Sequence, residues 1–252
     1  MNIEAVTVCV NYADFLAETL PWNMQHFSKI VVVTSFDDKE TLELCRKLSV
    51  ECRPTDVMYM DGDKFNKGRA VDFGIGYLRG TDWMCHIDAD TWLPPMTRNH
   101  LEKAHLDPEF IYGIDRCLCP DYDAWKSFIS GSPAHQHDYN CRVKMPPFPI
   151  ADRISLIEHS GYIPIGYFQL WHGKHNRRYP LHHHTAARSD VLFPLQWPSK
   201  NRAIIGEVVG IHLESELSEL GANWSGRTTK RFERHHHETP AQEAAEHKHY
   251  CK

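Results

Sequence analysis

The segment KIVVVT, residues 29–34, has four consecutive β-branched apolar residues at its centre, so both faces of the strand that it forms need cover. Such a run is typical of a strand in a parallel sheet with helices on both sides. Residues 4–10 (EAVTVCV) and 81–87 (TDWMCHI) are predicted as two further strands. Helical patterns separate these strands, at residues 12–27 (interrupted near Pro21), 38–48 and 64–79. This alternation predicts a doubly wound, mostly parallel sheet.

The pattern loosens after residue 90. Residues 130–149 are rich in Pro, Gly, His and Asn and are expected to form a long loop. Residues 221–252 are polar and end in a charged tail. The remaining elements are strands expected at 109–117, 163–171 and 203–212 and a short helix at 122–129. No linker separates two domains, so we expect one α/β domain with a loop-rich C-terminal half.

Composition narrows the class of protein. The chain has 252 residues, of which 42% are hydrophobic, and a net charge of -5. A single domain of this size buries an ample core, so a small disulfide scaffold is excluded, as are collagen-like and disordered chains. The acidic balance gives no overall electrostatic footprint for nucleic acid. The 18 histidines are the unusual count, and they suggest a metal.

The expected location is the cytoplasm. The eight cysteines are scattered without a C-x-x-C pair, which favours reduced thiols and argues against a cysteine-based zinc site. The chain begins Met-Asn-Ile-Glu, with an acid where a signal peptide carries positive charge, so we expect no targeting segment. No run of 18 apolar residues predicts a membrane span.

Polar residues follow three of the predicted strands. Asn11 follows the first, Ser35, Asp37 and Asp38 follow the second, and Asp88-Ala89-Asp90 follows the third. In an open parallel sheet, ligands bind outside the carboxyl ends of the strands. Asp88 and Asp90 stand at i and i+2, so in extended backbone both carboxylates point the same way and are able to hold one hard cation. A lone D-x-D is more often a turn or a cap, but this position favours a divalent metal site.

Four stretches together resemble the GT-A glycosyltransferases, in particular the family-2-like branch. They are VNYADFLAETLPW (10–22), VVVTSFDD (31–38), NKGRAVDFGI (66–75) and HIDADTWLP (86–94). The resemblance is good over about the first 95 residues. It implies a Rossmann-like GT-A domain with a nucleotide-sugar-binding half (1–95), an acceptor and catalytic half (96–226) and a polar charged tail (227–252). It also implies a nucleotide-sugar donor, with a UDP-sugar expected first, and Mn²⁺ or Mg²⁺ held by the D-x-D.

The resemblance assigns roles to single residues. Asp37 or Asp38 is expected to meet the nucleoside, beside Asn11 and Ser35. Lys67 and Arg69 stand where the family places basic residues near the diphosphate, with Asp88 adjoining. The metal ligands implied are Asp88, Asp90 and a histidine late in the domain, for which His212 is the best match. Mn²⁺ accepts such a mixed shell of carboxylate and imidazole.

The implied mechanism needs a carboxylate base to take the proton of the acceptor hydroxyl if the transfer inverts. The sequence lacks the paired Glu-Asp that usually marks this base in the family. Asp190 is the first candidate, Glu207 the second and Asp152 the third. Inversion is the expected outcome, and retention stays open.

Other signals leave alternatives open. Trp171 and Trp224 are candidates for lining an acceptor cleft or for packing. The runs His182–184 and His235–237 are expected to be mostly solvated. Two basic clusters suggest surface or diphosphate contacts, or a patch for a hydroxymethylated base in DNA; they are Lys174, Arg177, Arg178 and Arg227, Lys230, Arg231, Arg234. Competing functions of other classes are a sugar nucleotidyltransferase and a non-catalytic sugar- or metal-binding module.

Overall fold

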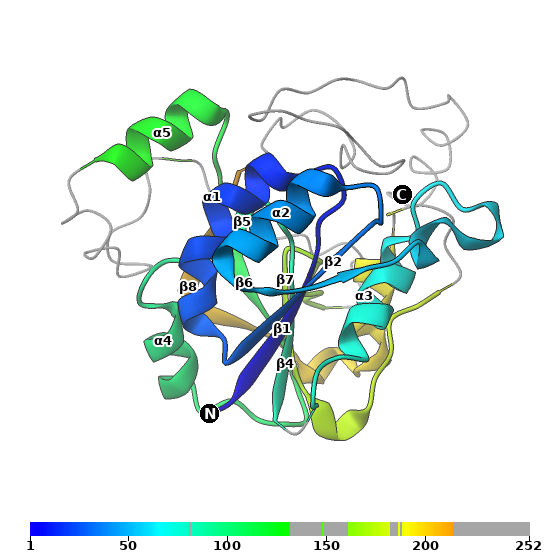
Figure 1. Cartoon of the computed structure of the whole chain (residues 1–252). Helices are drawn as coiled ribbons and strands as arrows, with labels where there is room; N and C mark the ends of the chain where they lie inside the picture. Colours follow the sequence, from blue (N-terminus) through cyan, green and yellow to red (C-terminus); the bar gives the residue numbers. More distant parts are fainter. Residues whose placement is uncertain (81, 132–147, 149–160, 182–185, 187, 214–252) are drawn as a thin grey trace, which may run out of the picture.

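The computed structural model describes residues 1–80, 82–131, 148, 161–181, 186 and 188–213, and these form one sheet of eight strands flanked by helices (Figure 1). From one edge of the sheet to the other, the strands are β3 (Glu51–Pro54), β2 (Lys29–Thr34), β1 (Ile3–Val8), β4 (Trp83–Ile87), β7 (Phe168–His172), β6 (Ile111–Leu118), β8 (Arg202–His212) and β5 (Thr91–Trp92).

The first four strands along the chain, β1 to β4, are parallel to one another, and we call them the parallel half. Their residues alternate between two cores. Ala5 and Val32 face one core, whereas Val6 and Val33 face the other. This alternation explains why residues 30–33 are all apolar, since neither face of the strand meets water there.

The remaining strands, β5 to β8, form what we call the mixed half. β7 runs antiparallel to both β4 and β6, β6 and β8 are parallel, and β5 is antiparallel to β8. Because two antiparallel pairings restore the direction, β6 and β8 end at the same edge of the sheet as β4. A bulge in β8 shifts its register against β6 between Ile114 and Asp115.

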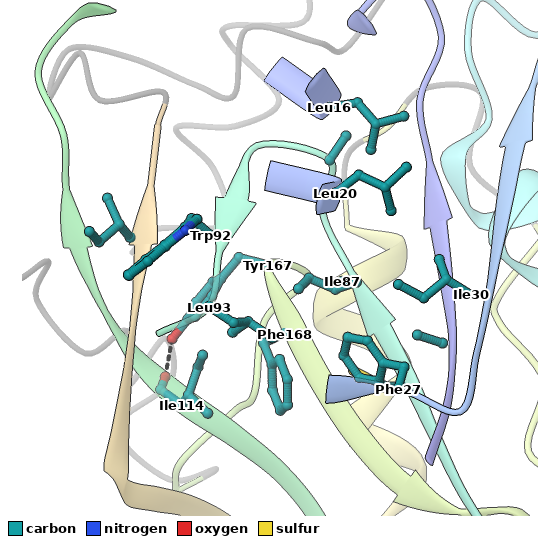
Figure 2. Packing of buried hydrophobic residues seen from close by; sticks show 14 of the residues in the cluster. Leu16, Leu20, Phe27, Ile30, Ile87, Trp92, Leu93, Ile114, Tyr167 and Phe168 are labelled. Atoms are coloured by element: carbon teal, nitrogen blue, oxygen red, sulfur yellow. Dashed lines mark hydrogen bonds between the residues drawn. The ribbon is translucent and has the colours of Figure 1, made fainter. Parts of the chain in front are cut away.

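Helices cover both faces. α1 (Ala13–Asn23) packs Leu16 and Leu20 onto the first core, where Trp92, Leu93 and Phe168 also lie (Figure 2). α3 (Lys67–Ile75) packs onto the second core. The others are α2 (Lys39–Leu48), α4 (Thr97–Lys103), α5 (Tyr122–Ser130), α7 (Ser189–Leu192) and the 3₁₀ segments η1 (Met24–His26), η2 (Val57–Gly62), η3 (Gly173–His175), η4 (Pro194–Gln196) and η5 (Ser199–Asn201).

Side-chain caps set where three of these helices begin. The carboxylate of Asp38 accepts from the N–H of Thr41 at the start of α2. Asn66 caps α3 in the same way, and Asp121 caps α5. Each cap satisfies an N–H that the first helical turn leaves without a partner. For α3 this places the helix start at Lys67, three residues later than the periodicity predicts.

The α/β fold and its parallel first half are confirmed, and several boundaries differ. The predicted strand over 163–171 starts only at Phe168, and the helix over 12–27 gives way to the 3₁₀ segment η1 after Asn23. β3, β5 and α4 were not predicted. Most of the loop expected over 130–149 lies outside the described residues. No helix in the described part of the chain has the length and apolar character that crossing a membrane requires.

Candidate active site

Asp88 and Asp90 lie in the turn between β4 and β5, at the carboxyl edge of the sheet. Two buried side chains of α1 hold this turn. The hydroxyl of Thr19 donates to the backbone carbonyl of Ala89 (2.6 Å), and the amide of Asn23 donates to the backbone carbonyl of Thr91 (2.8 Å). From the other side, the N–H of Leu213 donates to the carbonyl of Asp90 (2.9 Å). The turn is thus fixed by one helix and one strand.

His212 is the last residue of β8 and lies next to Asp90. The pairing of β5 with β8 sets Thr91 opposite His212. The Nε2 atom of His212 is 3.4 Å from Oδ1 of Asp90, and the two side chains are 15% and 9% exposed. The structure therefore brings together two of the three predicted metal ligands from positions far apart in the chain.

Lys67 reaches Asp88 from the first residue of α3. Its Nζ atom is 2.5 Å from Oδ1 of Asp88, and both side chains are about one-fifth exposed. Burial acts to lower the pKa of Lys67, but the charges of Asp88, Asp190 and Asp90 outweigh it and raise the pKa above its usual value. Lys67 is therefore a permanent ammonium at neutral pH.

Asp190 approaches the same ammonium from α7. Its Oδ2 atom accepts the N–H of Gly166 (3.1 Å) and its Oδ1 atom accepts the N–H of Val191 (2.9 Å). The segments that contain Gly68 and Gly166 lie close to α7 because glycine has no Cβ. A Cβ on Gly166 would lie 2.7 Å from the Cβ of Asp190, and one on Gly68 would collide with Ser189. Glycine at these two positions is thus what allows α7 to lie against the site.

The charges of the site do not balance. Burial raises the pKa of the Asp88 carboxyl to about 6, the Lys67 ammonium opposes this, and the charge of Asp90 adds to it. Three carboxylates, of Asp88, Asp90 and Asp190, thus surround one lysine. At neutral pH such a site attracts further positive charge.

The donor atoms fit a divalent cation of the Mg²⁺ or Mn²⁺ type, because carboxylate oxygens and an imidazole nitrogen are ligands that Mn²⁺ accepts. The side chains lie as separate pairs, with His212 at Asp90 and Lys67 at Asp88. Among the residues described, no group of three His, Cys, Asp or Glu side chains is already gathered as a metal centre. A metal ion held by Oδ1 of Asp88 would take the place of the lysine contact at that oxygen.

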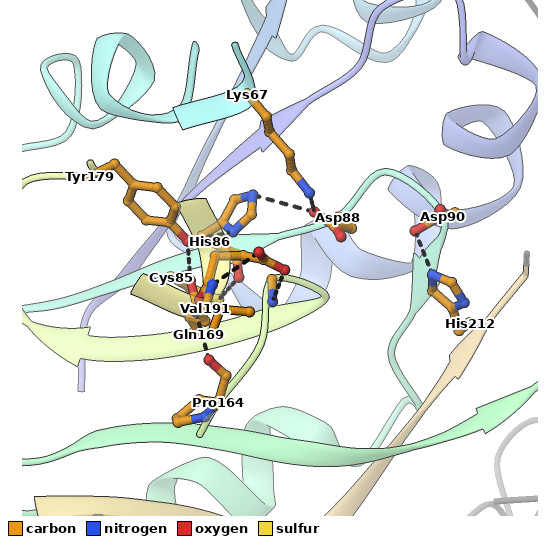
Figure 3. Close-up of polar contacts among 12 residues, drawn as sticks. Lys67, Cys85, His86, Asp88, Asp90, Pro164, Gln169, Tyr179, Val191 and His212 are labelled. Carbon is orange, nitrogen blue, oxygen red and sulfur yellow. Dashed lines mark hydrogen bonds and ion pairs between the residues drawn. The ribbon is translucent and has the colours of Figure 1, made fainter. Parts of the chain in front are cut away.

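A buried polar chain lies behind Asp88, and the sequence did not predict it (Figure 3). His86 has no exposed surface, and its Nε2 atom is 3.4 Å from Oδ1 of Asp88. Its Nδ1 atom is 2.9 Å from the hydroxyl of Tyr179, which donates to Oε1 of Gln169. Burial lowers the pKa of His86 well below its usual value, with Lys67 adding to the effect, so the ring is neutral.

The residues predicted to meet the nucleoside are placed unequally. Asp38 is 3% exposed, and its oxygens accept from the N–H groups of Asn11 (2.7 Å) and Thr41 (3.0 Å). Its visible role is to cap α2 and fix the loop after β1. Ser35 is also buried, whereas the side chains of Asp37 and Asn11 are exposed.

The other predicted residues lie apart from Asp88 or outside the description. Arg69 pairs with Asp61 (2.7 Å) and approaches Asp63 (3.6 Å), towards η2. Glu207 is exposed in the irregular part of β8, five residues before His212. Asp152 lies outside the described residues.

Trp171 is fully buried and packs edge-on against Phe193 (4.8 Å between centroids), so it is a core residue and does not line a cleft. In the first basic cluster, Lys174 pairs with Glu109 and Arg178 pairs with Asp72. These pairs favour an ordinary surface over a phosphate-binding patch. Trp224, both histidine runs and the second basic cluster lie outside the described residues.

Comparisons with known proteins give a family and a fold. The model of the family described as glycosyl transferase family 2 matches residues 5–164. A comparison with curated proteins finds no match. Mannosyl-3-phosphoglycerate synthase from Rubrobacter xylanophilus superposes with a TM-score of 0.51 at 15% identity, over 86% of this chain and 68% of that chain.

A second solved structure is glucosyl-3-phosphoglycerate synthase from Mycobacterium tuberculosis in complex with Mn²⁺, uridine-diphosphate-glucose and phosphoglyceric acid. It gives a TM-score of 0.52 at 12% identity, over 88% of this chain and 75% of that chain. At such identities the likeness shows the fold alone, and it agrees with the GT-A architecture expected from the sequence.

Proposed function

The chain belongs to glycosyl transferase family 2, and from that premise we propose that it moves a sugar from a UDP-sugar to an acceptor hydroxyl at the edge where Asp88 and Asp90 lie. The observation that carries the proposal is the convergence there of Lys67, Asp190 and His212 from three other elements. Family membership favours a transferase over a sugar nucleotidyltransferase or a non-catalytic module.

The proposed donor site is built to handle a diphosphate. As the bond between the anomeric carbon and the leaving oxygen breaks, negative charge develops on the departing nucleotide diphosphate. Asp88, Asp90 and His212 would hold a divalent cation, which supplies Lewis-acid stabilisation of that charge when bound. The Lys67 ammonium, held at the same edge by Asp88, supplies a second positive charge.

Asp190 is the base that we propose for the acceptor. Each of its oxygens accepts one backbone N–H, which fixes the carboxylate while leaving a lone pair on each oxygen. A base of this kind takes the acceptor proton as the new glycosidic bond forms, and inversion at the anomeric carbon follows. Glu207 and Asp152 remain the alternative bases.

The proposed cofactor and donor have support from a structural neighbour. The glucosyl-3-phosphoglycerate synthase of similar fold is described in complex with Mn²⁺ and uridine-diphosphate-glucose. This makes Mn²⁺ and UDP-glucose the first probes to use. The acceptor is open, and no observation on the described residues favours modified DNA.

The proposal is tested by incubating the protein with Mn²⁺ and a panel of UDP-, GDP- and dTDP-sugars and measuring release of the nucleotide diphosphate. We expect release from a UDP-sugar that stops when EDTA is added. Asp123→Ala, an exposed carboxylate on α5, is the matched control and should leave the rate unchanged. Release of pyrophosphate, or silence across the whole panel, would contradict the proposal.

A further inference from the structure

Gln169 fixes the direction of every hydrogen bond in the buried chain behind Asp88. Its Nε2 atom donates to two backbone carbonyls, those of Pro164 (2.7 Å) and Asp190 (2.6 Å). Both hydrogens of the amide are therefore used. The remaining atom, Oε1, accepts only, so it takes its hydrogen bond from the hydroxyl of Tyr179.

The hydroxyl of Tyr179 has a single hydrogen, and this determines which nitrogen of His86 is protonated. Because Tyr179 gives that hydrogen to Gln169, its oxygen faces Nδ1 of His86 as an acceptor, at 2.9 Å. Nδ1 of His86 must therefore carry the hydrogen. Nε2 of His86 makes no hydrogen bond in the described structure, so with the hydrogen on Nδ1 this second nitrogen presents a lone pair.

That lone pair is directed at the candidate active site. Nε2 of His86 is buried without a hydrogen-bond partner, and it lies 3.4 Å from Oδ1 of Asp88, which is also an acceptor (Figure 3). Two acceptors that face each other repel unless a cation lies against both. Lys67 already contacts this same oxygen of Asp88, which shows that the position accommodates positive charge.

We propose that Nε2 of His86 is a further ligand of the divalent cation, together with Asp88, and that Tyr179 and Gln169 are positioning residues that select this nitrogen. The inference rests on the proposed function. Histidines that bind metals commonly donate their other N–H to a neighbouring acceptor, the part that Tyr179 plays here. Two ligands of one octahedral ion lie about 3 Å apart, close to the observed separation.

The proposal gives Lys67 two positions in the reaction. A cation bound by His86 and Asp88 would use the oxygen of Asp88 that Lys67 contacts in this structure. Lys67 would then be free to contact the diphosphate of the donor.

The first test is the tautomer of His86 in the protein without added metal. Long-range ¹H–¹⁵N NMR spectra of protein labelled at histidine report which ring nitrogen carries hydrogen, and His86→Gln identifies the signal. We expect Nδ1–H in the wild type and a loss of that preference in Tyr179→Phe. An Nε2–H tautomer or a doubly protonated ring in the wild type would overturn the proposal.

The second test measures Mn²⁺ binding to the protein alone, by calorimetry. We expect about tenfold weaker Mn²⁺ binding in His86→Leu and in Tyr179→Phe. In a His86→Leu background, Tyr179→Phe should cause no further loss. His86→Gln, which keeps an oxygen donor near Nε2, should retain part of the affinity.

The outcomes separate this inference from the proposed function. Unchanged Mn²⁺ affinity in His86→Leu, with weaker binding in His212→Ala, overturns the role of His86 and leaves the transferase proposal standing. An additive loss in the double variant overturns the positioning role of Tyr179. Absence of both Mn²⁺ binding and UDP-sugar turnover overturns the inference and the proposed function together.

Discussion

The parallel half and the mixed half of the sheet meet at β4 and β7, and they contribute differently to the candidate active site. The parallel half supplies Lys67 and Asp88 from elements that follow one another along the chain. The mixed half supplies Asp190 and His212, which come together only through antiparallel pairing and a long return of the chain. The charged side chains of the candidate site therefore come from both halves and meet at their border, which we call the seam. Each half can be tested by itself.

Loss of the proposed base in the mixed half should have the largest effect. Asp190→Asn removes the proton acceptor, so we expect kcat to fall about a thousandfold with little change in the KM for the donor. Steady-state kinetics with a UDP-sugar measure both constants. Equal losses in kcat and donor affinity would instead indicate a binding role, and a comparable fall in Glu207→Gln would move the base to β8.

The second-largest effect is expected from loss of Asp90, the proposed metal ligand at the seam. Asp90→Ala removes a carboxylate that would bind the cation, and we expect the rate of nucleotide diphosphate release to fall about a hundredfold or more. The circular dichroism spectrum and the thermal unfolding midpoint should stay close to wild type. Near-normal turnover would refute the metal assignment for Asp90.

The halves also differ in the burial of their histidines, which affects stability against pH. Burial lowers the pKa of His26 to about 4, whereas His172, His175 and His212 of the mixed half are partly exposed. In the unfolded chain His26 binds a proton near pH 6.5, whereas in the folded chain it does so only near pH 4. The free energy of unfolding therefore keeps its full value above about pH 6.5 and decreases as the pH falls towards 4.

Urea unfolding at pH 7 and pH 5 measures this contribution. The free energy of unfolding should fall by about 2 kcal/mol less in His26→Leu than in the wild type over this interval. The control is the exposed residue His105, whose change to Gln should leave the pH dependence as it is. Equal pH dependence in His26→Leu and wild type would contradict the effect.

In the mixed half, His212 is expected to contribute less to metal binding than Asp90 does. We expect His212→Ala to raise the Mn²⁺ concentration needed for half-maximal rate about tenfold. His172→Ala is the comparison, since His172 pairs with Trp83 at the opposite end of β4. An unchanged Mn²⁺ requirement in His212→Ala would remove this residue from the metal shell.

The smallest effect is expected from α1, which holds the turn of the two aspartates from the parallel half. Thr19→Val removes the hydrogen bond to the carbonyl between Asp88 and Asp90 and should lower the free energy of unfolding by about 1 kcal/mol. Activity should fall severalfold because the aspartates lose one restraint. Unaltered stability and activity would show that Asn23 and Leu213 suffice to fix the turn.

The parallel half could be predicted from the sequence because its signals are local. Residues 29–34 form β2 with the expected bounds, since a run that is apolar on both faces has few alternatives to a covered parallel strand. The pair Asp88 and Asp90 was visible for the same reason, as it directly follows a buried strand. β5 was missed because two residues carry no periodicity.

The mixed half and the chain behind Asp88 depend on contacts between distant residues. His86 did carry a local signal, because it stands two positions before Asp88 on the same side of the strand. Nothing local pairs it with Tyr179 or Gln169, which lie on other elements. Asp38 shows the opposite case. Its spacing to Thr41 is that of a helix cap, so the local contact could be predicted, whereas its contact with a nucleoside stays a prediction.

The central claim is that one divalent cation binds with a nucleotide diphosphate at the seam of the two halves. A crystal structure of the protein with Mn²⁺ and UDP, with anomalous diffraction to locate manganese, tests this most directly. We predict a single manganese peak in contact with Asp88 and Asp90 and with the diphosphate of UDP. UDP bound elsewhere, or manganese without contact to either aspartate, would contradict the account.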